Sequence, residues 1–185
     1  DRFDDIIYSP NSGIKKIRVL INPTDNSSNW EEIILTEEAR TVIGVFDINT
    51  DGWNDIIYED VTTHINYYKN NSGEFTESVL IYNPTYTLTL FKTADIDLDG
   101  DIDIVGNFNS TGTLFFKNQG DGTVNTTIIS SDFYEHQLAV DDFDGDGYLD
   151  VMIRYSASIK IALFDLLSGE YDTPVGLGSI YANDY

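Results

Sequence analysis

The residues of this chain best suited to chemistry are aspartates that recur in one spacing. Residues 47–55 read D-x-N-x-D-G-x-x-D, and D-x-D-x-D-G-x-x-D returns at residues 95–103 and 142–150. Oxygen-bearing side chains at alternate positions, a glycine that permits a sharp turn and a closing carboxylate can surround a hard cation. The sequence therefore predicts three cation-binding loops.

Calcium is the ion that this donor set favours. It takes about six to eight oxygen ligands, whereas zinc prefers histidine or cysteine and magnesium demands strict octahedral geometry. Positions 1, 3, 5 and 9 would supply side-chain oxygens, and position 7 would supply its backbone carbonyl. The predicted ligands are Asp47, Asn49, Asp51, Trp53 and Asp55 in the first loop, Asp95, Asp97, Asp99, Asp101 and Asp103 in the second, and Asp142, Asp144, Asp146, Tyr148 and Asp150 in the third.

We expect about three calcium ions. A fourth, weak site is predicted near Asp1, Asp5 and Asp184, where a broken copy of the loop lies at the N-terminus. An EF-hand is the alternative to exclude, because it needs an acid at position 12 and flanking helices. Position 12 is Tyr58, Gly106 or Ile153, and the flanking segments are short apolar runs typical of strands.

The loop belongs to a longer repeat. The closing aspartates, with the matching Asp5, are spaced by 50, 48 and 47 residues, and each is followed by about four short segments of β-type alternation. Such a period is typical of solenoids and propellers, and four strands per repeat favour propeller blades. A β-sandwich also suits evenly spaced short strands, but it does not predict a near-identical loop in each repeat.

The predicted fold is therefore an all-β propeller of four-stranded antiparallel blades. One propeller region spans residues 1–185, with repeats at about 1–40, 41–89, 90–136 and 137–185. Both ends fall in the same phase of the repeat, so we expect a piece of a longer precursor. The C-terminal segment either completes the first blade of a small ring or starts a further blade of a larger propeller.

Composition excludes several classes of partner and site. The net charge of -22, from 32 acids against 10 bases, argues against nucleic acid and anionic membranes. The absence of cysteine excludes disulfides and thiolate metal sites. No apolar run approaches the roughly 20 residues of a membrane-spanning helix, so no membrane insertion is expected.

Catalytic residues are not predicted. His64 and His136 have no motif around them, Gly-x-Ser-x-Gly is absent, and the acids that could act in pairs are the ones a metal cage would use. Trp53 and Tyr148 lie within loops and could either pack between blades or stack on a sugar or protein partner. We expect a protein that is not an enzyme.

The loops, together with a Tyr-x-Lys-Asn…Gly-x-Phe hairpin at residues 67–75, resemble the FG-GAP/VCBS family of calcium-binding propeller repeats, which includes the blades of integrin alpha-subunits. The resemblance implies a secreted or cell-surface, calcium-stabilised module for adhesion or for binding an unidentified protein or glycan. The alternative is the propeller scaffold of a secreted polysaccharide-active enzyme such as a lyase. No literal Phe-Gly or Gly-Ala-Pro signature occurs, so no integrin-like partner site is carried over.

Overall fold

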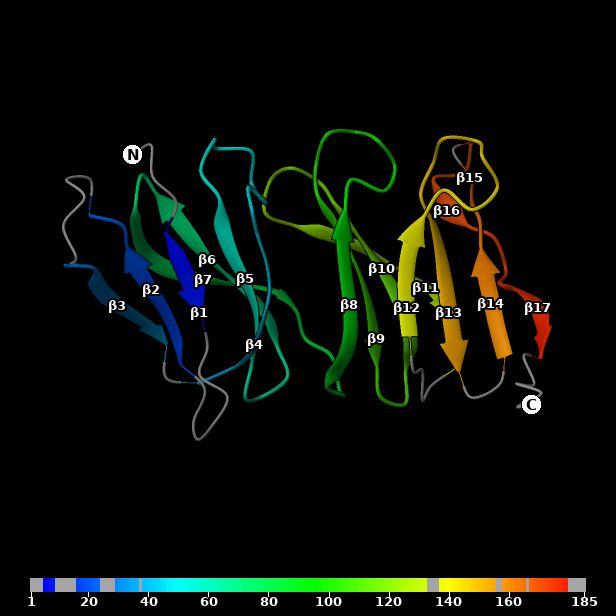
Figure 1. Cartoon of the computed structure of the whole chain (residues 1–185), viewed down its shortest axis with the longest axis horizontal. Helices are drawn as coiled ribbons and strands as arrows, with labels where there is room; N and C mark the ends of the chain where they lie inside the picture. The colour runs from blue at the N-terminus through cyan, green and yellow to red at the C-terminus, as the bar shows by residue number, and fades with distance from the viewer. Residues whose placement is uncertain are drawn as a thin grey trace. The chain divides into compact units, whose positions relative to one another are not determined.

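Every regular element of the chain is a β-strand among the residues that the structure describes. The computed structural model describes residues 5–8, 16–23, 29–36, 38–132, 137–155, 158–165 and 167–179. Its strands are joined by turns and by the acidic loops (Figure 1). In this part of the chain there is no helix that is long and apolar enough to cross a membrane. The predicted all-β class is confirmed.

The chain divides into two compact units. Unit 1 comprises Asp1–Phe46 and Trp53–Pro84, and unit 2 comprises Asp47–Gly52 and Thr85–Tyr185. The boundary crosses the first acidic loop, so residues 47–52 belong to unit 2 and the strand after that loop belongs to unit 1. That one propeller region spans the chain, with the repeat boundaries given above, stays a prediction.

Unit 1 holds two antiparallel sheets. The first has the order β1-β2-β3 and the second the order β4-β5-β6-β7. The strands are β1 (Ile6–Tyr8), β2 (Ile17–Ile21), β3 (Glu31–Thr36), β4 (Ala39–Phe46), β5 (Asp55–Asp60), β6 (Ile65–Asn71) and β7 (Glu74–Tyr82). Alternation in β2 places Ile17 and Val19 in one cluster with Ala39, Ile56 and Tyr58, so the two sheets share a core.

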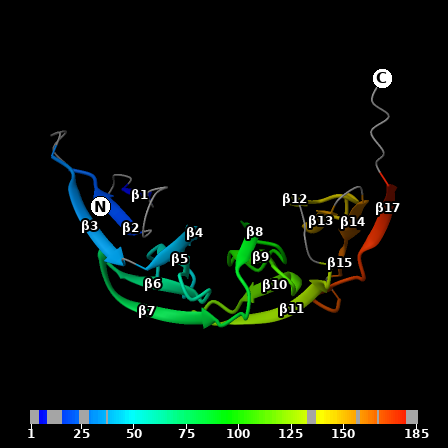
Figure 2. The same cartoon turned by 90° about the horizontal axis from the view of Figure 1, so that it is seen from below.

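Unit 2 contains two four-stranded antiparallel sheets and a small hairpin. The sheet orders are β11-β10-β9-β8 and β12-β13-β14-β17, and Figure 2 shows the first of them stepping from β8 at one edge to β11 at the other. The strands are β8 (Leu88–Ala94), β9 (Asp103–Phe108), β10 (Gly112–Asn118), β11 (Val124–Ser130), β12 (Gln137–Asp141), β13 (Asp150–Tyr155), β14 (Ser158–Ala162), β15 (Phe164–Asp165), β16 (Glu170–Tyr171) and β17 (Val175–Ser179).

A single apolar core joins the two large sheets of unit 2. Its buried members are Ile96, Val105, Phe115, Ile129, Leu138, Val151, Ile153, Ala162 and Phe164. The ring of Phe115 meets those of Phe164 and Tyr171 edge-on, with centroids 6.2 and 5.4 Å away. These edge contacts are a favoured geometry for aromatic rings, and they hold the β15–β16 hairpin against the β8–β11 sheet.

Of the five sheets that the described residues form, three have the four antiparallel strands predicted for a propeller blade. The first sheet has three strands among the described residues, and the predicted contribution of the C-terminal segment 180–185 lies outside them. The last blade differs in one respect from the expected pattern. An additional hairpin, β15–β16, which contains Tyr171, comes before the outer strand β17, and the bond from Asp172 N–H to Leu163 C=O (2.9 Å) closes it.

Candidate metal centre

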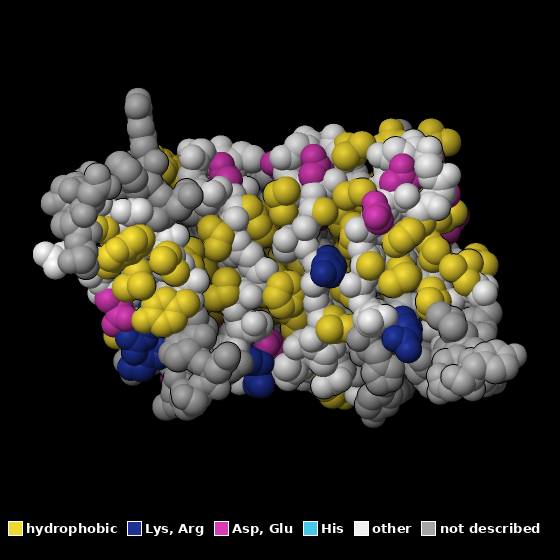
Figure 3. Space-filling model, in the orientation of Figure 1, with side chains coloured by type: hydrophobic (Ala, Val, Ile, Leu, Met, Phe, Trp, Pro, Cys, Tyr) yellow, Lys and Arg dark blue, Asp and Glu magenta, His cyan; other side chains and the backbone are white. Residues whose placement is uncertain are grey.

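The second acidic loop, residues 95–103, connects β8 to β9 and gathers three carboxylates. Asp95, Asp97 and Asp99 each place an oxygen within 4.8 Å of the others. Backbone N–H groups of the loop hold these side chains inward: Gly100 donates to Asp95 Oδ2 (3.2 Å) and Asp101 donates to Asp99 Oδ1 (3.0 Å). Acidic side chains are visible along the edge of unit 2 from which the loops project (Figure 3).

The third loop, residues 142–150, connects β12 to β13 and repeats this arrangement. Asp142, Asp144 and Asp146 have oxygens within 4.8 Å of one another. Gly147 N–H donates to Asp142 Oδ2 (3.0 Å), and Tyr148 N–H donates to Asp146 Oδ1 (2.9 Å). The two loops therefore present carboxylate oxygens at the same three positions, as the repeated sequence predicts.

In the first loop, residues 47–52 have the same turn. Asp51 N–H donates to Asp47 Oδ1 (3.1 Å) and to Asn49 Oδ1 (3.0 Å). The loop also docks on the β10–β11 turn, because Thr50 Oγ1 donates to Gly120 C=O (2.7 Å) and Gly122 N–H donates to Ile48 C=O (3.1 Å).

The remaining two predicted ligands of the first loop belong to unit 1. Trp53 is exposed there, and Asp55 is buried at the start of β5, where its Oδ1 accepts from Asn70 N–H (2.7 Å). The structure does not place these two ligands relative to Asp47, Asn49 and Asp51.

The closing aspartate at position 9 ties the loop to a later strand. Asp103 is fully buried, its Oδ2 accepts from Ile96 N–H (3.1 Å), and its Oδ1 accepts from Asn118 N–H (2.8 Å). Asp150 does the same with Phe143 N–H (2.9 Å) and Phe164 N–H (3.0 Å). Position 9 thus holds the start of the loop beside the end of β10 in one blade and beside β15, just after β14, in the next. Its role as a calcium ligand stays a prediction.

Burial and crowding of like charges oppose ionisation of these acids. Burial raises the pKa of Asp103 to about 7, and the nearby carboxylates of Asp99 and Asp95 act in the same direction. Burial also raises the pKa of Asp150, and burial together with Asp99 raises the pKa of Asp101. A bound cation would remove this electrostatic cost.

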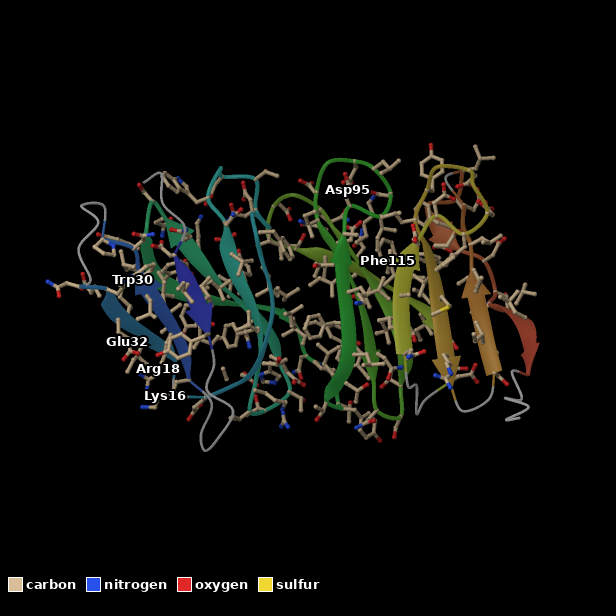
Figure 4. The ribbon with its side chains drawn as sticks, in the orientation of Figure 1. Lys16, Arg18, Trp30, Glu32, Asp95 and Phe115 are labelled. Carbon is tan, nitrogen blue, oxygen red and sulfur yellow. The ribbon has the colours of Figure 1, made fainter. Side chains whose placement is uncertain are left out.

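One buried oxygen supports a cation in the second loop. Asp95 Oδ1 is buried without a hydrogen-bond partner, and the side chain lies in the loop that follows β8 (Figure 4). A buried oxygen without a partner costs free energy unless some donor or cation satisfies it. The donor set is all oxygen, so the residues present fit calcium.

The side chains at position 7 make contacts outside their own loop. The Tyr148 ring packs on Phe164, with centroids 6.3 Å apart, and Asp101 Oδ2 lies beside Gly120. These side chains differ between loops, which is consistent with a position that would bind the ion through its backbone carbonyl.

Sequence reasoning missed a conformational requirement at position 4. Thr50, Leu98 and Gly145 all have positive φ, at 52°, 60° and 82°. Glycine adopts this left-handed conformation without strain, whereas threonine and leucine do not. Among these three residues, Gly145 alone indicates the left-handed conformation from the sequence, since threonine and leucine rarely adopt it.

Sequence reasoning also missed Lys117 as a residue of the site. Its Nζ donates to Asp97 Oδ2 and lies 3.3 Å from Asp99 Oδ2. Because Lys117 falls within the alternating strand at residues 112–118, the sequence pattern indicates only a strand residue there.

The predicted fourth site falls mostly outside the described residues. Asp1 and Asp184 lie there, and Asp5 Oδ1 accepts from Asn22 N–H (2.8 Å). His136 is also outside them. His64 belongs to a turn, where its N–H donates to Asp60 Oδ1 (3.0 Å) and its Nδ1 lies 3.4 Å from Asp60 Oδ2.

Comparison with known proteins agrees with this architecture. A family model described as FG-GAP-like repeat matches residues 47–106 and again residues 95–153. No curated protein matches the sequence. A lectin of Agrocybe aegerita, whose structure is described as the basis of specific recognition of non-reducing terminal N-acetylglucosamine, is similar with a TM-score of 0.61 and 20% identity. The match covers 90% of this chain and 49% of the lectin chain, so this chain spans about half the lectin's length.

Proposed function

Because the chain belongs to the FG-GAP-like repeat family, we propose that it is a non-enzymatic, extracellular binding module whose blades are stiffened by calcium. The observation that carries the proposal is the pair of matching clusters, Asp95–Asp97–Asp99 and Asp142–Asp144–Asp146, each drawn together within 4.8 Å. Like charges so close repel one another strongly unless a cation lies between them.

Calcium would supply positive charge at these loops and would be coordinated by their oxygen atoms. Asp95, Asp97 and Asp99 would hold it in the second loop, and Asp142, Asp144 and Asp146 in the third. The position 9 aspartates then transmit that rigidity, because their bonds to Asn118 N–H and Phe164 N–H join each loop to its own blade. Extracellular calcium modules have Kd values of about 10⁻⁴–10⁻³ M, which suits a secreted or cell-surface location.

The ligand that we propose is a glycan or a protein bound by exposed loops and aromatic side chains. Trp30 and Trp53 are both exposed in unit 1, and a solvent-facing indole can stack on a sugar ring or a peptide. The lectin with a similar fold supports a glycan as the first class to test. The proposal that the chain is not an enzyme is supported by the engagement of its clustered acids in loop hydrogen bonds.

Thermal unfolding with and without calcium tests the proposal. At 10 mM calcium and a Kd of 0.1–1 mM, each site adds about 1.4–2.7 kcal/mol of stability. For a chain of this size, one kcal/mol raises Tm by about 2–4 °C, so two sites predict a rise of at least 5 °C over the protein in EDTA. The Asp97→Ala variant should lose part of that rise, and Asp132→Asn, outside the loops, should keep it.

An unchanged Tm on adding EDTA would refute the calcium part of the proposal. The binding part is tested with a glycan array probed in calcium and again in EDTA. Glycan binding that is lost in EDTA supports the binding part of the proposal. Glycan binding that persists in EDTA would show that the protein binds glycans without needing calcium.

A further inference from the structure

Lys117 is placed against the second acidic loop by the strand that carries it. It lies near the end of β10, where its Nζ contacts Asp97 and lies 3.3 Å from Asp99. The Asp97 side chain is only 7% exposed in this pairing, so the ammonium covers it from solvent. The oxygens that Lys117 binds are among those that calcium would need.

The fold fixes this contact through the hydrogen bond that the aspartate at position 9 accepts from a later strand. Asp103 Oδ1 accepts from Asn118 N–H, so the end of β10 is held beside the loop and the preceding residue, Lys117, reaches into it. In the last blade the equivalent hydrogen bond runs from Phe164 N–H to Asp150 Oδ1. The residue preceding Phe164 is Leu163, which has no charge to offer the third loop.

We propose that Lys117 is a tethered cation that competes with calcium for the second loop, whereas Leu163 leaves the third loop without such a competitor. This inference rests on the proposed calcium function. Lys117 must leave Asp97 and Asp99 before the same oxygens can bind a metal ion, so its charge weakens calcium binding at this loop. When calcium is scarce, the same charge offsets repulsion among the carboxylates and keeps the loop folded.

The competition is measured loop by loop with ¹⁵N-labelled protein titrated with calcium. Gly100 N–H donates to Asp95 Oδ2 and Gly147 N–H donates to Asp142 Oδ2, so the two amide signals report the second and third loops separately. Each loop is compared with itself across variants. This removes the difference that the second loop carries Asp101 where the third carries Tyr148.

Lys117→Met keeps the length of the side chain and removes its charge. Removing a unit charge a few ångströms from the ion should lower the Kd reported by Gly100 by on the order of tenfold, and leave the Kd reported by Gly147 unchanged. Leu163→Lys should raise the Kd reported by Gly147 alone. Lys117→Arg, which keeps the charge, should stay close to the wild-type affinity.

Lys160→Met is the matched control, since Lys160 is a lysine of the same unit that pairs with Asp132 away from the two loops. It should change neither Kd. An unchanged Gly100 response in Lys117→Met, or an equal change at both glycines, would overturn the inference while leaving the calcium proposal intact. If calcium moved neither signal in the wild type, both the inference and the proposed function would be refuted.

Discussion

The buried carboxyl of Asp103 should make the stability of the protein depend on pH, and bound calcium should flatten or reverse that dependence. In the chelated protein, burial raises the pKa of this carboxyl to about 7, whereas an aspartate in the unfolded chain has a pKa of about 3.9. Between these values the folded state binds a proton that the unfolded state has released. The resulting stability is complete below about pH 4 and is lost as pH rises through 7.

The size of the effect follows from the two pKa values. A difference of about three pKa units corresponds to about 4 kcal/mol over the whole range, and roughly 2.5 kcal/mol of this falls between pH 5 and pH 8. The raised pKa of Asp150 contributes with the same sign. The aspartates whose pKa is lowered, such as Asp121 and Asp132, titrate below this window.

Urea unfolding in EDTA at pH 5, 6, 7 and 8 measures this slope, with Asp103→Asn as the comparison. The wild type should lose stability as the pH rises, and the variant should lose about 2.5 kcal/mol less, because asparagine does not titrate. In saturating calcium the wild-type slope should flatten or reverse, since a metal ion favours ionised carboxylates. Equal slopes for the wild type and Asp103→Asn in EDTA would show that this carboxyl is ionised at low pH, and the reasoning would be wrong.

Substitutions test three further local features, each by chemical unfolding. Gly112→Ala should lower the free energy of unfolding by about 3 kcal/mol or more, because its Cβ would lie 2.0 Å from Ser130 O at a φ of +105°. Gly73→Ala, at a φ of +98° with open space around it, should lower it by about 1–2 kcal/mol. Similar losses for the two variants would contradict the steric argument. Leu98→Asn should stabilise the protein by about 0.5–1 kcal/mol, since Leu98 is 55% exposed and adopts a left-handed conformation that asparagine tolerates; a loss of stability would mean that its side chain is needed. Phe115→Ala should cost about 3–5 kcal/mol, and a cost under 1 kcal/mol would argue against the shared core.

The repeat made the architecture predictable. A loop of fixed composition returning every 47 to 50 residues, with alternating segments between its copies, indicates blades, and the sheets of the structure follow that order. The β15–β16 hairpin was not predictable in the same way. Its turn at Leu167 to Gly169 resembles the turn between the third and fourth strands of other repeats, so local composition could not separate the two.

The candidate site was predictable where it depends on local spacing. Alternate aspartates and a glycine specify a turn whose amides bind the side chains, and the structure has that turn in the second and third loops. Lys117 escaped prediction because its approach to Asp97 depends on strand register, which the sequence does not state. The left-handed conformation of Leu98 escaped for the opposite reason, since leucine there argues against it.

The core that spans the two large sheets of unit 2 bears on how such chains can be cut and recombined. Each sequence repeat supplies one large sheet, yet Phe115 packs against Phe164 and Tyr171, which come from the next repeat along the chain. A fragment that stopped after β11 would lose both of these ring contacts and expose part of the Phe115 ring, so protein engineers should take neighbouring sheets in pairs. The sequence repeats one sheet at a time, but burial of the core in unit 2 requires two neighbouring sheets.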